Sequence, residues 1–350
     1  MGDIVINNDK KILILDMVTW ANKRDITLDV TRALCILWIV GYYHLENYVQ
    51  DDFFFQYCWD SHHGKYVTIC VLSAFTFLSG YFLRKYSINS KSDIIIFYRK
   101  RLHRFWIPFF LSALILHIAS LCIHHPWFIS HWHFIATVLG LSVFTPPSPG
   151  TIWYISMLMT FYMITPFVLY LKSVSIKLFV SIMLVVAMAM LVNEYNLNIR
   201  TVYYLPVYLI SLQMPSKWVQ IIKEKWLFFL VISLVVLIVT LFMLDIRWIS
   251  IVTSIVFGPI FLISLSSFLA KSYYLCKFSG VISYSSMNMY LFHRHIFMVF
   301  VLVSSSIGIG SFHDMKTSLW LLLFIALPII ITFSYYCQKL YDRLCKSLGW

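Results

Sequence analysis

The sequence is dominated by apolar stretches, most of them about 17–25 residues long, the length that crosses about 30 Å of hydrocarbon as an α-helix. Hydrophobic residues make up 60% of the 350-residue chain and charged residues only 12%, which is far from the usual mix of a soluble domain. We therefore predict an all-α fold, a polytopic bundle of membrane helices. The candidate segments lie approximately at residues 28–48, 66–83, 105–123, 132–144, 151–171, 178–192, 201–214, 226–244, 248–270, 282–303 and 317–336.

Segment 132–144 is a poor candidate for a crossing. It is short, it begins beside His131 and His133, and it leads directly into the turn-forming sequence TPPSPG at Thr145–Gly150. A re-entrant or interfacial segment tolerates such a composition better than a lipid-exposed span does. We therefore expect about ten transmembrane helices plus this short segment.

The positions of the basic residues predict the orientation in the membrane. The chain carries 27 Lys and Arg residues and a net charge of +12, and most of the 27 fall in links on one side of a ten-span topology. The positive-inside rule assigns that side, with both termini, to the cytoplasm. We expect a cytoplasmic N-terminal segment at 1–27, a membrane domain at 28–336 and a cytoplasmic tail at 337–350. Because the positive charge serves this topology, membrane lipid is the expected partner and nucleic acid is not.

Few ionisable side chains fall at membrane depth, where each costs roughly 2.5–3.5 kcal/mol on insertion scales and is a candidate functional residue. His44 lies about 18 Å along the first segment from Arg32, which is at the inner edge. The middle of the last but one segment holds His293, Arg294 and His295. Structural roles stay open, since His44 could hydrogen-bond a neighbouring helix and Arg294 could pair with backbone carbonyls. In either case both side chains should face the protein interior.

Five stretches resemble, in order, the signature sequences of the acyltransferase 3 family of integral-membrane O-acyltransferases. Residues 28–44 (LDVTRALCILWIVGYYH) are similar to the first helix of that family, and 75–82 (FTFLSGYF) to its F-x-L-S-G-F signature. Residues 101–109 (RLHRFWIPF) are similar to its R-x-x-R-[IL]-x-I-P-[FY] variant. Two later stretches, 153–166 (WYISMLMTFYMITP) and 283–294 (SYSSMNMYLFHR), resemble its W-[FY]-L…Y…P and Y-S…YL-[IF]-H helices. The ordered set spans nearly the whole membrane domain.

The resemblance implies an enzyme that moves an acyl group, most often acetyl, to a hydroxyl of a cell-surface or lipid-linked glycan in the inner (plasma) membrane of a bacterium. It also implies that His44 is catalytic and that Arg32 is essential. Histidine suits a general base because its ordinary pKa of about 6.5 lies near working pH. The donor, acetyl-CoA or another acyl-CoA, would be a co-substrate, and no permanently bound cofactor is expected.

The spacing of the first-helix pair departs from the family pattern. Family members place the arginine and histidine eleven positions apart, or about 20° on the helix surface, whereas Arg32 and His44 are twelve apart, or about 120°. A single π-bulge absorbs one extra residue and often occurs at functional sites. We therefore expect a π-bulge near Gly41 that returns His44 to the face of Arg32.

Two further groups of residues are candidates for binding the donor and the acceptor. A basic cluster at the inner surface could bind the phosphates of coenzyme A as charge-assisted pairs, or it could serve only as a positive-inside anchor; it consists of Arg99, Lys100, Arg101 and Arg104. Aromatic residues in helices more often pack in the core than stack on sugars. With that alternative open, we expect acceptor contacts from Trp153, Tyr162, Tyr290, His293 and Arg294.

Other functions have less support in the sequence. The alternative is a transporter or exporter of a lipid-linked sugar that uses His44 and Arg294 as a proton relay, but the two halves, 28–171 and 178–336, show no inverted repeat. Four histidines between positions 124 and 133 lack acidic or cysteine partners at a metal-binding spacing, so no metal site is expected. The absence of P-loop, G-x-G-x-x-G, G-x-S-x-G and H-E-x-x-H motifs gives no support to nucleotide hydrolysis, dinucleotide redox chemistry, serine hydrolysis or zinc proteolysis.

Overall fold

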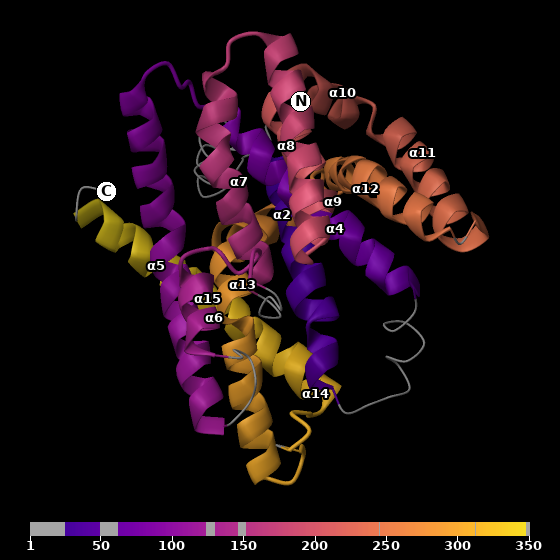
Figure 1. The fold of residues 1–350 in the computed structure, drawn as a ribbon. Helices are drawn as coiled ribbons and strands as arrows, with labels where there is room; N and C mark the ends of the chain where they lie inside the picture. Colours follow the sequence, from indigo (N-terminus) through magenta and orange to yellow (C-terminus); the bar gives the residue numbers. More distant parts are fainter. Residues whose placement is uncertain are drawn as a thin grey trace, which may run out of the picture.

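The computed structural model describes residues 25–49, 62–123, 130–145, 152–244, 246–311 and 313–347, and within them the chain forms helices and no strand (Figure 1). The side chains of residues 62, 63, 103, 104, 123 and 242–244 are not described. The predicted all-α fold is confirmed. The helices are α2 (Ile26–Trp38), η1 (Ile39–Tyr43), η2 (Leu45–Tyr48), α4 (His62–Leu83), α5 (Lys91–Ile123), α6 (His131–Val138), α7 (Trp153–Tyr170), α8 (Val174–Tyr195), α9 (Arg200–Gln213), α10 (Ser216–Glu224), α11 (Trp226–Ile238), η3 (Val239–Leu244), α12 (Arg247–Leu269), α13 (Tyr273–Ser306), α14 (Leu319–Leu321), η4 (Leu322–Ala326) and α15 (Leu327–Ser347).

The helices form a polytopic bundle with fewer long spans than predicted. Within the described residues, eight helices are long and apolar enough to cross a membrane, or nine if the bent pair of α10 and α11 counts as one span. A helix coincides with each of the ten expected spans, but α9 has only 14 residues, about 21 Å of length. The α6 helix has eight residues, so segment 132–144 is not a full crossing, as expected.

The 91° bend between α10 and α11 follows from two different sequence patterns. In α10, Val219 and Ile222 are buried while Lys217 and Trp218 are exposed. In α11 the sequence is apolar almost throughout. An amphipathic helix lies in the plane of the interface, whereas an apolar helix enters the hydrocarbon. The pair therefore fits a chain that runs along the membrane surface before it turns into the bilayer.

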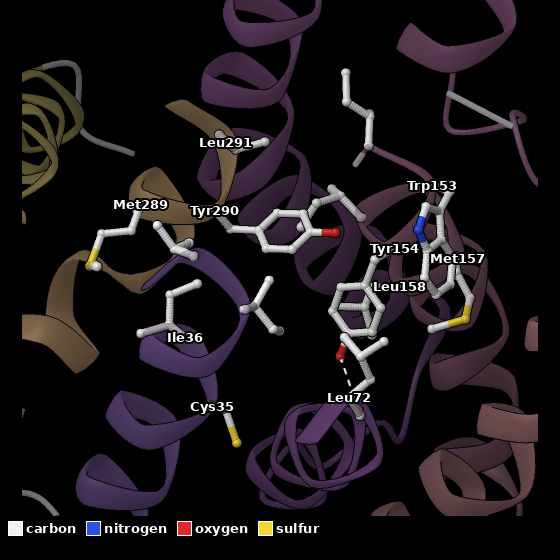
Figure 2. Packing of buried hydrophobic residues seen from close by; sticks show 14 of the residues in the cluster. Cys35, Ile36, Leu72, Trp153, Tyr154, Met157, Leu158, Met289, Tyr290 and Leu291 are labelled. Carbon is white, nitrogen blue, oxygen red and sulfur yellow. Dashed lines mark hydrogen bonds between the residues drawn. The ribbon is translucent and has the colours of Figure 1, made fainter. Parts of the chain in front are cut away.

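The α2 helix lies inside the bundle, in contact with α4, α12 and α13. Glycines allow the neighbouring helices to cross closely: a Cβ at Gly258 of α12 would lie 2.6 Å from the Cα of Cys70, and one at Gly80 of α4 would lie 2.6 Å from the carbonyl oxygen of Tyr208. No side chain fits at these crossings, so the two glycines allow the backbones to pack closely. Figure 2 shows the apolar core where α2, α4, α7 and α13 meet.

The loop between α13 and α14 closes one end of the bundle over α2. The Thr317 amide donates to the Tyr48 carbonyl at 2.8 Å, and the Lys316 ammonium donates to the Glu46 carbonyl at 3.3 Å. Both acceptors belong to η2, the 3₁₀ turn that follows η1. This loop therefore holds the end of the first span in place, and the position of the residues just before η2 depends on it.

Candidate active site

The first span contains the π turn that the sequence predicted. Helix α2 continues directly into η1, and the amide of His44 donates to the carbonyl of Ile39 at 2.8 Å, five positions back. A turn of this kind accommodates one extra residue. It includes Gly41, where a Cβ would lie 3.2 Å from a methyl carbon of Leu327. The expected π-bulge near Gly41 is therefore confirmed.

The π turn directs Arg32 and His44 towards the same neighbouring helix, α13. Nη1 of Arg32 donates to Oγ of Ser283 at 3.4 Å, and Nδ1 of His44 lies 2.9 Å from Nε2 of His293. The two partners on α13 are about 15 Å apart along the helix axis. The shared face expected for Arg32 and His44 is therefore present.

His44 and His293 form a buried pair. His44 is 8% exposed and His293 is fully buried, and their rings lie nearly parallel, with centroids 4.9 Å apart. On its other side, Nδ1 of His293 lies 2.8 Å from the carbonyl oxygen of Tyr290 and 3.2 Å from that of Met289. The pair thus connects the end of η1 to the backbone of α13.

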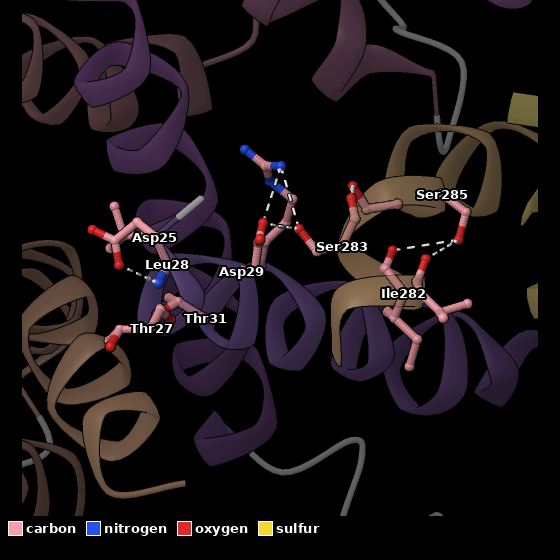
Figure 3. A network of polar contacts seen from close by, with 11 residues as sticks. Asp25, Thr27, Leu28, Asp29, Thr31, Ile282, Ser283 and Ser285 are labelled. Carbon is pink, nitrogen blue, oxygen red and sulfur yellow. Dashed lines mark hydrogen bonds and ion pairs between the residues drawn. The ribbon is translucent and has the colours of Figure 1, made fainter. Parts of the chain in front are cut away.

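Arg32 is held by a polar network at the opposite end of α2 (Figure 3). Oγ of Ser283 donates to Oδ1 of Asp29 at 2.6 Å while it accepts from Arg32. Nη1 of Arg32 lies 4.0 Å from the same Oδ1 of Asp29. The guanidinium also lies 4.9 Å from the centroid of the Phe82 ring. A carboxylate, a hydroxyl and an aromatic face therefore fix the direction of this cation.

A cavity of about 410 Å³ opens beside Arg32, with walls from α2, α4, α5, α7 and α13. Its cationic lining residues are Arg32, Lys85 and Arg101, and the carboxylates of Asp25 and Asp29 also line it. Its aromatic lining residues are Phe75, Phe82, Phe105, Tyr154, Tyr162 and Tyr290. A space with charges and rings on its walls suits a ligand that is anionic at one end and less polar along its length.

The histidine pair lies just beyond the cavity wall at Tyr290. Neither histidine lines the cavity, but the ring of Tyr290 is 6.2 Å from that of His44 and 6.1 Å from that of His293, measured between centroids. The ring of Tyr154 stands 5.8 Å from Tyr290 on the cavity side. A ligand group that moved from the cavity to His44 would therefore pass the Tyr290 side chain.

The residues of the predicted basic cluster differ in whether they reach the cavity. Arg101 reaches the cavity, where its Nη2 donates to the hydroxyl of Tyr86 at 3.0 Å. Arg99 and Lys100 are exposed and are not part of the cavity wall. The side chain of Arg104 lies outside the described part of the chain. Of the three described members of the cluster, Arg101 alone contacts the cavity.

The predicted acceptor residues also separate into groups. Tyr162 and Tyr290 line the cavity. Trp153 is buried at the start of α7, with the Arg200 guanidinium 4.8 Å from its ring centroid. Arg294 is half-buried beside the Tyr48 hydroxyl, on the far side of the histidine pair from Arg32. His293 contacts His44, as described above.

Three site residues were not singled out from the sequence, namely Asp29, Lys85 and Ser283. Asp29 precedes Arg32 by three positions, a spacing that brings side chains together on a helix, so this pair was visible in the sequence. Ser283 lay within a quoted motif, but its contact with Arg32 is between residues 251 positions apart. Lys85 lies after the end of α4 and had no spacing signal.

Metal-ligating side chains do not cluster in the part of the chain that the structure describes. There, no group of three His, Cys, Asp or Glu residues is placed to hold an ion. Two of the four histidines between positions 124 and 133 lie in α6. Nδ1 of His131 lies 3.1 Å from Nε2 of His117, and Nδ1 of His133 lies 2.8 Å from Oγ of Ser130. His124 and His125 lie outside the described residues.

Comparison with known proteins agrees with the motifs and the fold. No curated protein and no solved structure matches the chain. The acyltransferase 3 family model, described as an acyltransferase domain, matches residues 25–339, which include the histidine pair, the Arg32 network and every residue of the cavity wall. The chain therefore belongs to the acyltransferase 3 family and is a membrane acyltransferase.

Proposed function

We propose that the protein transfers an acyl group, most simply acetyl, from acyl-CoA to a hydroxyl of a cell-surface or lipid-linked glycan. The observation that carries this proposal is a buried histidine pair one side chain beyond the wall of a cavity with three cations. A coenzyme A thioester calls for both features, because its phosphates are fixed anions and its carbonyl must meet a base-activated hydroxyl.

The donor would enter the cavity from its basic end. Lys85 and Arg101 line the cavity and would pair with the nucleotide phosphates. The rings of Tyr154 and Tyr290 continue along the wall towards His44. The exposed side chains of Arg99 and Lys100 would add long-range attraction at the same surface, and Arg104 remains part of this proposed site. The acyl-CoA acts as a co-substrate, not as a resident cofactor.

His44 is the proposed general base. Arg32 lines the cavity, and its partner on α13 is about 15 Å along the helix from the partner of His44, so Arg32 is proposed to bind the donor away from the reacting carbonyl. The acceptor oxygen attacks the carbonyl carbon, so that a C–O bond forms as the C–S bond breaks. The hydroxyl proton passes to His44 and then to the departing CoA thiolate. A general base contributes about 10²–10⁴-fold to such a step.

The acceptor would approach His44 from the end opposite to Arg32. Arg294, beside Tyr48, lies at that end, and Trp153 offers an aromatic ring of the kind that sugars contact. With both termini in the cytoplasm, as the basic residues predict, the cavity faces the cytoplasm and the acceptor lies outside. Acyl transfer would then cross the inner or plasma membrane of a bacterium.

Incubation of purified protein in nanodiscs with radiolabelled acetyl-CoA and a panel of glycans tests this function. We expect label on a glycan hydroxyl with the native protein and none with His44→Ala, and we expect surface polysaccharide from cells with that variant to lose O-acetyl groups. If the native protein neither binds nor consumes acetyl-CoA or a longer acyl-CoA, the proposed donor is wrong. In sealed proteoliposomes, donor and acceptor on the same side only should give no product.

A further inference from the structure

His293 uses both of its ring nitrogens inside the protein. Its Nδ1 faces the carbonyl oxygens of Tyr290 and Met289, and its Nε2 faces Nδ1 of His44. With the ring fully buried, these contacts leave no polar atom of His293 for a substrate. The geometry therefore favours a role within the protein over the substrate contact expected from the sequence.

The partners of His293 assign the hydrogens on both rings. A carbonyl oxygen only accepts hydrogen bonds, so Nδ1 of His293 carries a hydrogen. Burial favours the neutral ring, and in a neutral ring Nε2 of His293 is then bare and accepts. The hydrogen between the two rings must therefore come from Nδ1 of His44. This leaves Nε2 of His44 without a hydrogen, so it can accept a proton.

We propose that His293 is a positioning residue that fixes His44 in the tautomer whose Nε2 takes the proton of the acceptor hydroxyl. This inference rests on the proposed function and extends it from the residue to the reacting atom. Without His293, the hydrogen of His44 could occupy either nitrogen, and only one of the two tautomers would have a lone pair at the reacting position.

The same contact would also serve His44 after it has taken the proton. As the acceptor oxygen bonds to the carbonyl carbon and the C–S bond breaks, Nε2 of His44 gains the hydroxyl proton and the ring becomes a cation. Its Nδ1–H still donates to the neutral Nε2 of His293, and this bond strengthens because its donor is now charged. The proton then leaves from Nε2 to the CoA thiolate, so both rings return to their starting tautomers.

A histidine suits this position better than the carboxylate that usually supports a catalytic histidine. A carboxylate would be a buried anion at membrane depth, where a charged side chain is costly. Imidazole offers a neutral acceptor instead. The ring of His293 is also held in place, because Phe297 meets it edge-on at 5.9 Å between centroids and the two α13 carbonyls fix its Nδ1.

Nitrogen NMR of histidine-labelled protein in lipid tests the tautomer directly. We expect the signals lost in His44→Gln to be those of a protonated Nδ1 and a bare Nε2. In His293→Leu, which removes the acceptor, we expect the His44 signals to divide between the two tautomers. A native His44 with its hydrogen on Nε2 would overturn the inference, whether or not the protein transfers acyl groups.

Kinetics test whether the tautomer matters for catalysis. His293→Leu should lower kcat by about 10²-fold or more with KM for acyl-CoA unchanged, since general-base catalysis contributes about 10²–10⁴-fold. His293→Gln keeps an acceptor oxygen near the position of Nε2 and should stay within about tenfold of the native kcat. The matched control is His295→Gln. His295 is a buried histidine of the same helix, but its Nε2 lies 3.0 Å from the Ser112 carbonyl oxygen and does not contact His44.

The outcomes separate this inference from the proposed function. A native kcat in His293→Leu would overturn the positioning role. Equal losses of kcat in His293→Leu and His293→Gln would also overturn it, provided that both variants keep the native affinity for acyl-CoA. In either case the acyltransferase function stands. If no acyl-CoA is consumed by the native protein but NMR shows the expected tautomer, the proposed donor fails and the assignment of the hydrogens stands.

Discussion

The two ends of the polar face of the first span are built in different ways. At one end Arg32 meets a carboxylate and a hydroxyl on the wall of a cavity. At the other end His44 meets a second neutral ring in a buried position outside that cavity. Charge is therefore kept at the Arg32 end, the open end, where a ligand can enter from the cavity. The candidate base is kept at the His44 end, the closed end, where a charge would be costly.

The largest effect should come from the closed end. His44→Gln removes the proposed base, and we expect kcat to fall about 10²–10⁴-fold. Because His44 does not line the cavity, the affinity for acetyl-CoA should stay close to that of the native protein. Initial rates and calorimetric titration of the same nanodisc preparation measure the two quantities. Loss of acetyl-CoA affinity in His44→Gln would show that the two ends are not separate.

The next largest effect should come from the open end. Arg32→Ala removes a cation from the cavity wall that is proposed to bind the donor, and KM for acetyl-CoA should rise about 10²-fold, the upper end of what hydrogen bonds to a charged group contribute. Arg32→Lys keeps the charge but loses the planar fork, so its KM should lie between that of the native protein and that of Arg32→Ala.

Ser283→Ala removes one of the contacts that hold Arg32 and should raise KM for acetyl-CoA about tenfold or less, because one hydrogen bond to a charged group is lost. Initial rates over a range of acetyl-CoA concentrations give KM and kcat for all three variants. If Arg32→Ala lowers kcat and leaves KM for acetyl-CoA unchanged, Arg32 acts in the chemical step and does not bind the donor.

A smaller effect should separate two neighbouring arginines. Arg101→Ala removes a cation from the cavity wall and should raise KM for acetyl-CoA about tenfold, because hydrogen bonds to charged groups contribute about 1.5–3 kcal/mol. Arg99→Ala is the matched control, since Arg99 is exposed and outside the cavity wall, and should change KM by about twofold or less. The native KM should also rise with salt. Equal changes in both variants would mean that the donor binds along the surface.

Local patterns made much of the fold predictable. The apolar segments were long, so each of the ten expected spans coincides with a helix. Within the described residues, eight or nine helices are long and apolar enough to cross, because apolar character does not fix helix length. The α9 helix ends at Gln213, and the amphipathic α10 holds α11 at a bend. Both outcomes depend on where a helix ends, which is the part of a helix that sequence determines least.

The candidate site was predictable in its first helix and less so elsewhere. The spacing of Arg32 and His44 predicted a π turn because only one extra residue had to be absorbed. The partner of His44 could not be predicted in the same way, because His293 is 249 positions away and its neighbours in sequence give no sign of which helix it faces. For a similar reason, the sequence could not show that Arg101 lines the cavity while Arg99 is exposed, because the direction of each side chain depends on how α5 packs.

The smallest effect is expected where the two ends are joined, at the π turn. Deleting Gly41 should convert η1 to a regular helix and place the histidine eleven positions from Arg32, about 20° from it on the helix surface. Since the π turn already absorbs the extra residue, both ends should keep their partners on α13, and activity should fall about tenfold or less.

An alanine inserted after Gly41 is the matched control for the deletion. It adds about 100° of rotation, turns His44 away from His293, and should lower kcat as far as His44→Gln does. Thermal unfolding of both variants in nanodiscs checks that they are folded. A deletion variant that is folded but as inactive as the insertion variant would mean that the π turn is needed for its own shape. In that case it does more than align the open and closed ends of the site.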